Sequence, residues 1–242
     1  MKINQNDVTF FTYADEKYYP FVMPYVYSIL KNTTSNYRII IDNLENYYNQ
    51  YGKKWANIQH NCIHKWSGQQ NYYTENTIKN IIPNSIRFMY IPPKATKYTY
   101  ITDVDMIITS DMFEKALENN IEGMKRNQAP FFNIVRDSGP KLSGVHFVET
   151  KKWYPKVVQY LKKFEDISDV NQFGDEGLLY KMVKECFGDP EKLTEGNERI
   201  LPGYHLSPNR GKKYTDIKNR LCKDEDWEYA FTQFSPDFLK MF

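Results

Sequence analysis

The sequence predicts an α/β fold with a mostly parallel central sheet flanked by helices. Short apolar runs rich in β-branched and aromatic residues alternate with longer amphipathic segments, which is typical of parallel strands joined by helices. The chain has 242 residues, 41% of them hydrophobic, so it can bury a sizeable core. No repeat, low-complexity tract or Pro/Gly/Ser-rich linker divides it, so residues 1–242 are expected to form a single domain.

The first elements follow from local patterns. Val8–Tyr13 ("VTFFTY") is β-branched and aromatic and predicts a buried strand. A helix should begin at Pro20, because apolar residues then recur at helical spacing, and Pro24 lies in the first turn, where proline is tolerated. Tyr37–Asp42 ("YRIIID") predicts a second strand, and the polar segment 43–82 is expected to be mostly helical.

The remaining elements alternate in the same way. "SIRFMYIPP" predicts a short helix that Pro92 and Pro93 end. It leads into the strand-like run 98–109, and the next helix is expected near Ser110–Asn119, where the Ser110 hydroxyl can cap it. After these come strands at 129–135 and 143–149 and helices at 153–164 and 175–187. In such sheets, ligands bind at the carboxyl ends of the strands.

Bulk properties exclude several classes of function. The net charge of +2 gives no general electrostatic reason to bind nucleic acid. The three cysteines are far apart and form no Cys-x-x-Cys pair, which argues against disulfides and a zinc site and favours a reducing cytoplasm. No signal-peptide core and no apolar run of membrane-spanning length occurs, so we expect a cytoplasmic protein without a transmembrane segment.

Two acids interrupt the most strand-like run of the chain, "YTYITDVDMIIT". In an extended strand Asp103 and Asp105 point to the same side, while Val104 points the other way into the sheet. Neighbouring carboxylates repel each other, and a hard divalent cation between them removes that cost. A solvated turn with two surface acids is the alternative, but apolar residues flank the pair on both sides. We therefore expect a metal site at the end of this strand.

"YITDVDMII" resembles the Asp-x-Asp motif of metal-dependent glycosyltransferases with the GT-A fold. The resemblance implies one Rossmann-like GT-A domain in which Mn²⁺ or Mg²⁺, held at Asp103 and Asp105, grips the diphosphate of a nucleotide-sugar. It also places Val104 against the nucleotide. "TYADEKYY" is similar to the opening of glycosyltransferase family 8, although a polar loop with incidental aromatic residues is the alternative. By that similarity the nucleotide contacts are Thr12, Tyr13 and Ala14, with Asp15 and Tyr18 nearby.

Three further segments resemble donor-sugar elements of the same family. Arg87 precedes the acidic strand, where the family often has an arginine that reaches the donor sugar and the acids; a surface arginine is the alternative. "LSGVHFVE" implies that Ser143 and Gly144 approach the donor sugar, although its first residue is Leu where the family usually has Asn. "FGDEGLL" implies that Asp175, with Glu176 beside it, lies beneath the sugar, and a simple helix cap is the rival explanation.

The late segment "LPGYHLSPNRGKKY" resembles the family's His-x-x-Gly-x-x-Lys-Pro-Trp motif, but Pro208 replaces the first glycine. The resemblance implies that His205 is the third protein ligand of the metal, and imidazole beside two carboxylates suits Mn²⁺. It also implies a cation on the diphosphate, and the sequence leaves open whether this is Arg210, Lys212 or Lys213. His146 lies in an apolar alternation and is expected to be a hydrogen-bonded core residue.

The predicted activity is transfer of a sugar from a nucleotide-sugar, with UDP favoured, to a hydroxyl of a glycan or glycoconjugate. Retention is favoured over inversion; an inverting enzyme would need a base, for which Asp175 or Glu176 is the candidate, and Arg87 completes the catalytic set. The alternatives are a haloacid-dehalogenase-type sugar phosphatase, a nucleotidyltransferase, which should carry a glycine-rich loop after the first strand, and a non-catalytic carbohydrate-binding relative.

The acidic, aromatic segment 224–242 could contact a membrane surface peripherally or a partner enzyme. Its acids oppose binding to anionic lipid, so packing on its own domain is favoured.

Overall fold

The structure, a computed structural model, describes residues 4–55 and 81–206. Its centre is a five-stranded sheet in the order β2-β1-β3-β6-β5. The first three strands pair in parallel, β6 is antiparallel to β3, and β5 is antiparallel to β6. Every strand of this sheet except β6 therefore runs in one direction, which confirms the predicted mostly parallel sheet. The strands are β1 (Val8–Ala14), β2 (Asn36–Ile41), β3 (Tyr98–Ile101), β5 (Phe131–Phe132) and β6 (His146–Glu149).

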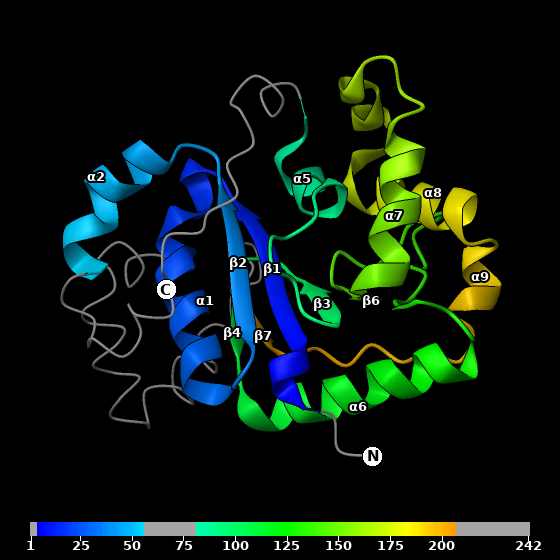
Figure 1. The fold of residues 1–242 in the computed structure, drawn as a ribbon, viewed down its shortest axis with the longest axis horizontal. Coiled ribbons are helices and arrows are strands. Elements are labelled where there is room, and N and C mark those ends of the chain that lie inside the picture. The colour runs from blue at the N-terminus through cyan, green and yellow to red at the C-terminus, as the bar shows by residue number, and fades with distance from the viewer. Residues whose placement is uncertain (1–3, 56–80, 207–242) are drawn as a thin grey trace.

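Helices cover both faces of this sheet, as Figure 1 shows. Phe10 and Tyr100 pack with α1 and α6 on one face, while Phe11 and Ile101 pack with α5, α7 and α8 on the other. Because successive strand residues point to opposite faces, each central strand contributes to both cores. The helices are α1 (Tyr19–Asn32), α2 (Leu44–Trp55), α5 (Pro83–Met89), α6 (Ser110–Arg126), α7 (Thr150–Leu161), α8 (Gly174–Cys186) and α9 (Pro190–Leu193), with 3-10 turns η1 (Gln5–Asp7), η2 (Glu16–Tyr18) and η3 (Ile167–Phe173).

The acidic run 98–109 is not one strand, and this corrects the prediction. It consists of β3, a connection at residues 102–105, and the short strand β4 (Met106–Ile108). β4 leaves the main sheet and pairs with β7 (Gly203–His205) in a separate two-stranded sheet. The amide of Ile108 donates to the buried Ser28 hydroxyl of α1 at 3.0 Å, so β4 is held against this helix. The two acids therefore lie where the chain changes sheets.

Most other predicted elements are present, with shifted ends. α6 extends to Arg126, well beyond the predicted end. Ser110 is its first residue, and the preceding Thr109 makes no side-chain cap bond, so the predicted serine cap is wrong. The predicted strands at 129–135 and 143–149 shorten to β5 and β6, with an isolated bridge between Val135 and Leu142.

Two predictions concern segments that lie partly or wholly outside the described residues. Of the expected helical region 43–82, α2 is present, and residues 56–80 lie outside the described residues. The segment 224–242 also lies outside them. Within the ranges 4–55 and 81–206, no helix is both long enough and apolar enough to cross a membrane.

Candidate metal centre

Several acidic side chains gather at the carboxyl edge of the main sheet. β1, β2 and β3 run in parallel, so the residues that follow them, Asp15, Asp42 and Asp103, emerge at the same edge. β6 runs the opposite way, so the segment that enters it, including Gly144, also lies at this edge. The acids therefore lie at the edge of the sheet where the sequence predicts that ligands bind.

Asp103, Asp105 and His205 form a compact group at this edge. One oxygen of each carboxylate and one imidazole nitrogen lie within 4.8 Å of one another. The Nε2 atom of His205 lies 3.1 Å from Asp105 Oδ1 and 3.6 Å from Asp103 Oδ2. Asp105 is almost completely buried, with 5% exposure, so its carboxylate needs a compensating partner. Two oxygens and one nitrogen are a suitable ligand set for Mn²⁺ and an acceptable one for Mg²⁺.

Strand pairing brings His205 to the acids across 100 positions of sequence. In the register of β4 with β7, His205 is opposite Met106, the residue after Asp105. The amide of Leu206 donates to the backbone carbonyl of Asp105 at 2.6 Å, which extends this pairing into the acidic connection. The position of the histidine is therefore set by a short antiparallel ladder.

Gly203 is the residue that allows this ladder to form. A Cβ atom at this position would lie 1.9 Å from the backbone oxygen of Ile107, which cannot move without moving β4. We expect Gly203→Ala to displace β7 and His205 and to weaken Mn²⁺ binding by about tenfold or more, as the loss of groups that orient metal ligands typically does. Calorimetric titration with Mn²⁺ measures the effect.

Gly177→Ala is the matched control, since a Cβ there meets only Phe173 Cβ, at 3.8 Å, and alanine favours the helix. This control should bind Mn²⁺ normally. If Gly203→Ala also binds Mn²⁺ as the unaltered protein does, the β4–β7 register does not position a metal ligand.

Arg87 is the second component of the site. Its side chain, on α5, is only 4% exposed. It forms an ion pair with Asp103 Oδ1, and its Nη2 atom lies 3.6 Å from Asp175 Oδ2. A Cβ on Gly144 would lie 2.9 Å from Arg87 Nη2, so the glycine lets the backbone come close to the guanidinium. The predicted residues Arg87, Asp103, Gly144 and Asp175 are thus neighbours.

The charges of this group are only partly balanced. Burial disfavours the Asp103 carboxylate, but Arg87 and His205 outweigh it and hold the pKa of Asp103 below its usual value. Burial likewise disfavours the Arg87 guanidinium, but Asp103 and Asp175 raise its pKa above the usual value. The carboxylates of Asp103, Asp105 and Asp175 surround the single guanidinium of Arg87, and Arg199 makes only a smaller contribution to the pKa of Asp103, so negative charges are in excess. A divalent cation would neutralise them, so the residues fit such an ion.

Asp15 and Asp42 form a second acidic pair, at the ends of β1 and β2. Burial and then the nearby Asp42 carboxylate raise the pKa of Asp15. One Asp15 oxygen, Oδ1, is buried and has no hydrogen-bond partner among the described residues. Tyr19 donates its hydroxyl to Asp42. Burial raises the pKa of the nearby Tyr18, and the carboxylates of Asp105, Asp103 and Asp15 raise it further.

Most of the other predicted site residues are buried within the fold around the metal centre. Thr12 is fully buried and donates its hydroxyl to the carbonyl of Thr102 at 2.8 Å, which fixes the start of the acidic connection. Glu176 pairs with Arg136, with 3.7 Å between Glu176 Oε1 and Arg136 Nη1. The predicted contacts Tyr13, Ala14, Val104 and Ser143 are also buried, and Arg210, Lys212 and Lys213 lie outside the described residues.

Asn133 is a structural residue of the site that the sequence analysis missed. Its buried amide donates to the carbonyl of Ser143 at 3.0 Å and accepts from the amide of the same residue at 2.9 Å. It also contacts His146 Nδ1 at 2.9 Å. Burial lowers the pKa of His146 to about 3, and the prediction of a hydrogen-bonded core histidine is confirmed. A polar residue inside the apolar run "FFNIV" was the available signal for Asn133.

Comparison with protein-family models found no match. Comparison with curated protein sequences found none either.

Among solved structures, the chain is similar to glycosyltransferases. GlyE of Streptococcus pneumoniae TIGR4 matches with 14% identity and a TM-score of 0.45, over 78% of this chain and 44% of that chain. The galactosyltransferase LgtC, in complex with donor and acceptor sugar analogs, matches with 13% identity and a TM-score of 0.44, over 97% of this chain and 100% of that chain. The chain spans less than half of the GlyE chain. With identities this low, its function has to be inferred from its own site residues.

Proposed function

We propose that this protein is a glycosyltransferase that moves a sugar from a nucleotide-sugar, with a UDP-sugar favoured, to a hydroxyl of a glycan or glycoconjugate. One observation carries the proposal. Two carboxylates and an imidazole converge at the carboxyl edge of an α/β sheet, beside a buried arginine that reaches a third carboxylate. A diphosphate with an attached sugar needs this combination, because its charge requires a cation and its hydroxyls require fixed polar partners.

Asp103, Asp105 and His205 would hold Mn²⁺ or Mg²⁺. Such an ion would act as a Lewis acid that stabilises the negative charge of the departing nucleoside diphosphate. The oxygen Asp103 Oδ2 faces His205, whereas Oδ1 is taken by Arg87, so this carboxylate can serve the metal and the arginine together. The buried arginine also lowers the pKa of Asp103, which would keep this carboxylate charged and ready to bind the ion.

The donor would lie across the same edge of the sheet. The half-buried Asp15 and Tyr18 are the contacts best placed for the nucleoside, and the unsatisfied oxygen Asp15 Oδ1 is an acceptor for a ribose hydroxyl or a base N–H. Thr12, Tyr13 and Ala14 are buried at the end of β1, directly before Asp15, and are proposed to support the nucleoside region. Arg210, Lys212 or Lys213 is proposed for the diphosphate by the sequence resemblance alone.

Arg87, Gly144 and Asp175 are proposed for the donor sugar. Asp175 lies in the first turn of α8, one residue after its start at Gly174, and it pairs with Arg87, which supports a role in holding sugar hydroxyls. Glu176 is engaged with Arg136, which leaves it a weaker candidate for a base. These contacts favour retention of configuration, because a retaining transfer does not require a separate base for the acceptor hydroxyl.

A sugar phosphatase of the haloacid-dehalogenase type is the main rival. That chemistry needs an acidic pair directly after the first strand, where the nucleophile lies beside a later lysine. In this chain the acidic pair follows β3, and β1, α1 and β2 precede it in the sequence. Asp103 is also held by Arg87, which makes it a poor nucleophile.

The test is donor turnover with a panel of UDP-sugars in the presence of Mn²⁺ or Mg²⁺, followed as released UDP. We expect at least one donor to be consumed, slowly with water and faster with a sugar acceptor. Chelation with EDTA should stop the release of UDP, and added Mn²⁺ should restore it, because the ion stabilises the leaving group.

Sugar phosphates serve as the control substrates. Release of inorganic phosphate from them without any nucleotide would identify a phosphatase and contradict the proposal. Donor binding without turnover under all conditions would identify a non-catalytic binding protein instead.

A further inference from the structure

A concavity lies at the opposite edge of the sheet from the candidate metal centre. It encloses about 800 Å³ between α6 and α7, and its lining includes Tyr98, the first residue of β3, and Glu149, the last residue of β6. These two residues are paired across the strands. Asp103 follows the other end of β3, so the concavity, which we call the α6–α7 groove, is separate from the candidate metal centre.

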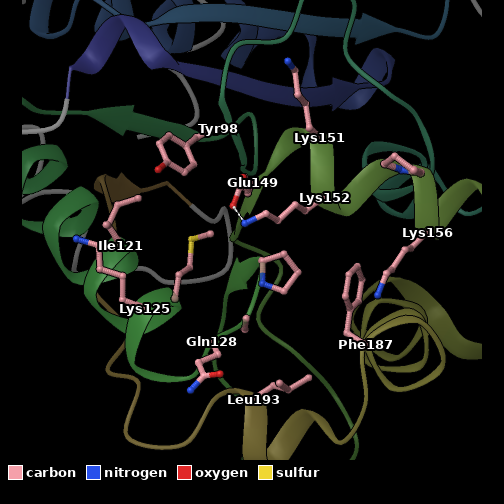
Figure 2. Close-up of a pocket in the computed structure, with 14 residues that line it drawn as sticks. Tyr98, Ile121, Lys125, Gln128, Glu149, Lys151, Lys152, Lys156, Phe187 and Leu193 are labelled. Atoms are coloured by element: carbon pink, nitrogen blue, oxygen red, sulfur yellow. Dashed lines mark ion pairs between the residues drawn. The ribbon is translucent and has the colours of Figure 1, made fainter.

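The α6–α7 groove concentrates positive charge. Four lysines line it with a single acidic residue, Glu149, although the net charge of the whole chain is only +2. Figure 2 shows Lys125 on α6 across from Lys152 and Lys156 on α7. Lys152 forms an ion pair with Glu149 at 2.8 Å, and Lys156 lies over the Phe187 ring. Lys125 and the fourth lysine, Lys151, make no ion pair with any described residue.

The apolar part of the groove is recessed behind these lysines. Ile121, Met124 and Ala129 are each at most 7% exposed, and Phe187 and Leu193 are half-buried. The lysine side chains are exposed at the rim. An occupant should therefore carry several negative charges and insert at least one apolar side chain between them.

We propose that the α6–α7 groove binds an acidic polypeptide segment of a partner protein, one in which carboxylates alternate with large apolar side chains. The charge of the rim is complementary to the carboxylates, and the recessed floor accepts the apolar side chains. A bilayer fits less well, because insertion needs apolar side chains that protrude, and here they are recessed. A small anion fits less well, because the polar side chains of the lining sit at the rim and none is buried.

The probe is a short fluorescein-labelled peptide that alternates glutamate with leucine and phenylalanine, followed by fluorescence anisotropy with the full chain. We expect binding that weakens with salt, and no binding of a matched peptide with glutamine in place of glutamate. The variant Lys125→Glu with Lys151→Glu should bind the acidic peptide at least about tenfold more weakly, because two attractions become repulsions. Neither lysine has a described ion pair to lose, so the fold should be kept.

Lys115→Glu with Lys162→Glu is the matched control, since Lys115 is exposed on α6, Lys162 is exposed directly after α7, and neither lines the groove. This variant should bind the peptide normally. The proposal is overturned if the peptide does not bind, or if both variants bind it equally. It is also overturned if phosphatidylglycerol vesicles bind in the peptide's place, or if inorganic phosphate displaces the peptide at the peptide's own concentration.

Discussion

Asp105→Asn should remove metal-dependent donor turnover, with a loss on the order of a thousandfold, while the protein still folds. Asparagine has the shape of aspartate but no charge, and a hard divalent cation depends on carboxylate oxygen. Asp105 is buried and lies 3.1 Å from His205, so no other described carboxylate can replace it without moving the backbone. Released UDP at saturating Mn²⁺ measures the activity.

Thermal unfolding with and without Mn²⁺ separates binding from folding. When the free Mn²⁺ concentration is a hundred times Kd, binding stabilises the folded protein by about 2.7 kcal/mol and raises its Tm. The Asp105→Asn variant should lose this rise in Tm. Its Tm without metal should be unchanged or higher, because one of two repelling carboxylates is gone. Asp111→Asn, at an exposed position on α6, is the control and should keep the Mn²⁺ response. Metal-dependent turnover that survives Asp105→Asn would remove the metal centre from the proposed function.

Arg87→Met should be the most destabilising of the site substitutions, with a loss of about 3–5 kcal/mol in the free energy of unfolding. Methionine fills similar space but leaves the carboxylates of Asp103 and Asp175 without their cation. A buried charge that loses its partner retains its full desolvation cost. Urea unfolding at neutral pH measures the loss, and Mn²⁺ should recover part of it by neutralising the same acids.

Two further variants distinguish the loss of charge at Arg87 from the loss of its packing. Arg87→Met combined with Asp103→Asn should be more stable than Arg87→Met alone, because the stranded carboxylate is then absent. Arg136→Met removes an arginine from a more exposed pair with Glu176 and should cost about 1 kcal/mol or less. Equal losses for Arg87→Met and Arg136→Met would show that Arg87 does not balance a buried acidic cluster.

The periodicity of the sequence was sufficient to identify most strands and helices. β1, α1 and β2 lie within a residue or two of their predicted bounds, because each is a continuous apolar or amphipathic run that tertiary contacts did not override. The strand-like run 98–109 misled the prediction, since its apolar residues serve two different sheets. Periodicity reports that a residue is buried, but it does not report which strand is its neighbour.

The acidic pair was identifiable for a similar reason. Carboxylates inside an apolar run are costly unless something compensates them, so Asp103 and Asp105 were already conspicuous in the sequence. The capping explanation for Asp175 was equally reasonable from sequence, and it is wrong: Phe173 holds the N-cap position of α8, and Asp175 lies in the first turn and pairs with Arg87. The neighbouring Glu176 turns to Arg136 instead.

Local sequence thus specified the α/β alternation, the acids at the end of a strand, and a histidine suited to join them. The folded chain settled which groups meet: β6 reverses direction and brings Gly144 to Arg87, and β7 places His205 beside Asp105. These contacts join residues far apart in the chain. They depend on strand order and register, which follow from the packing of the whole domain and are not encoded in any short segment.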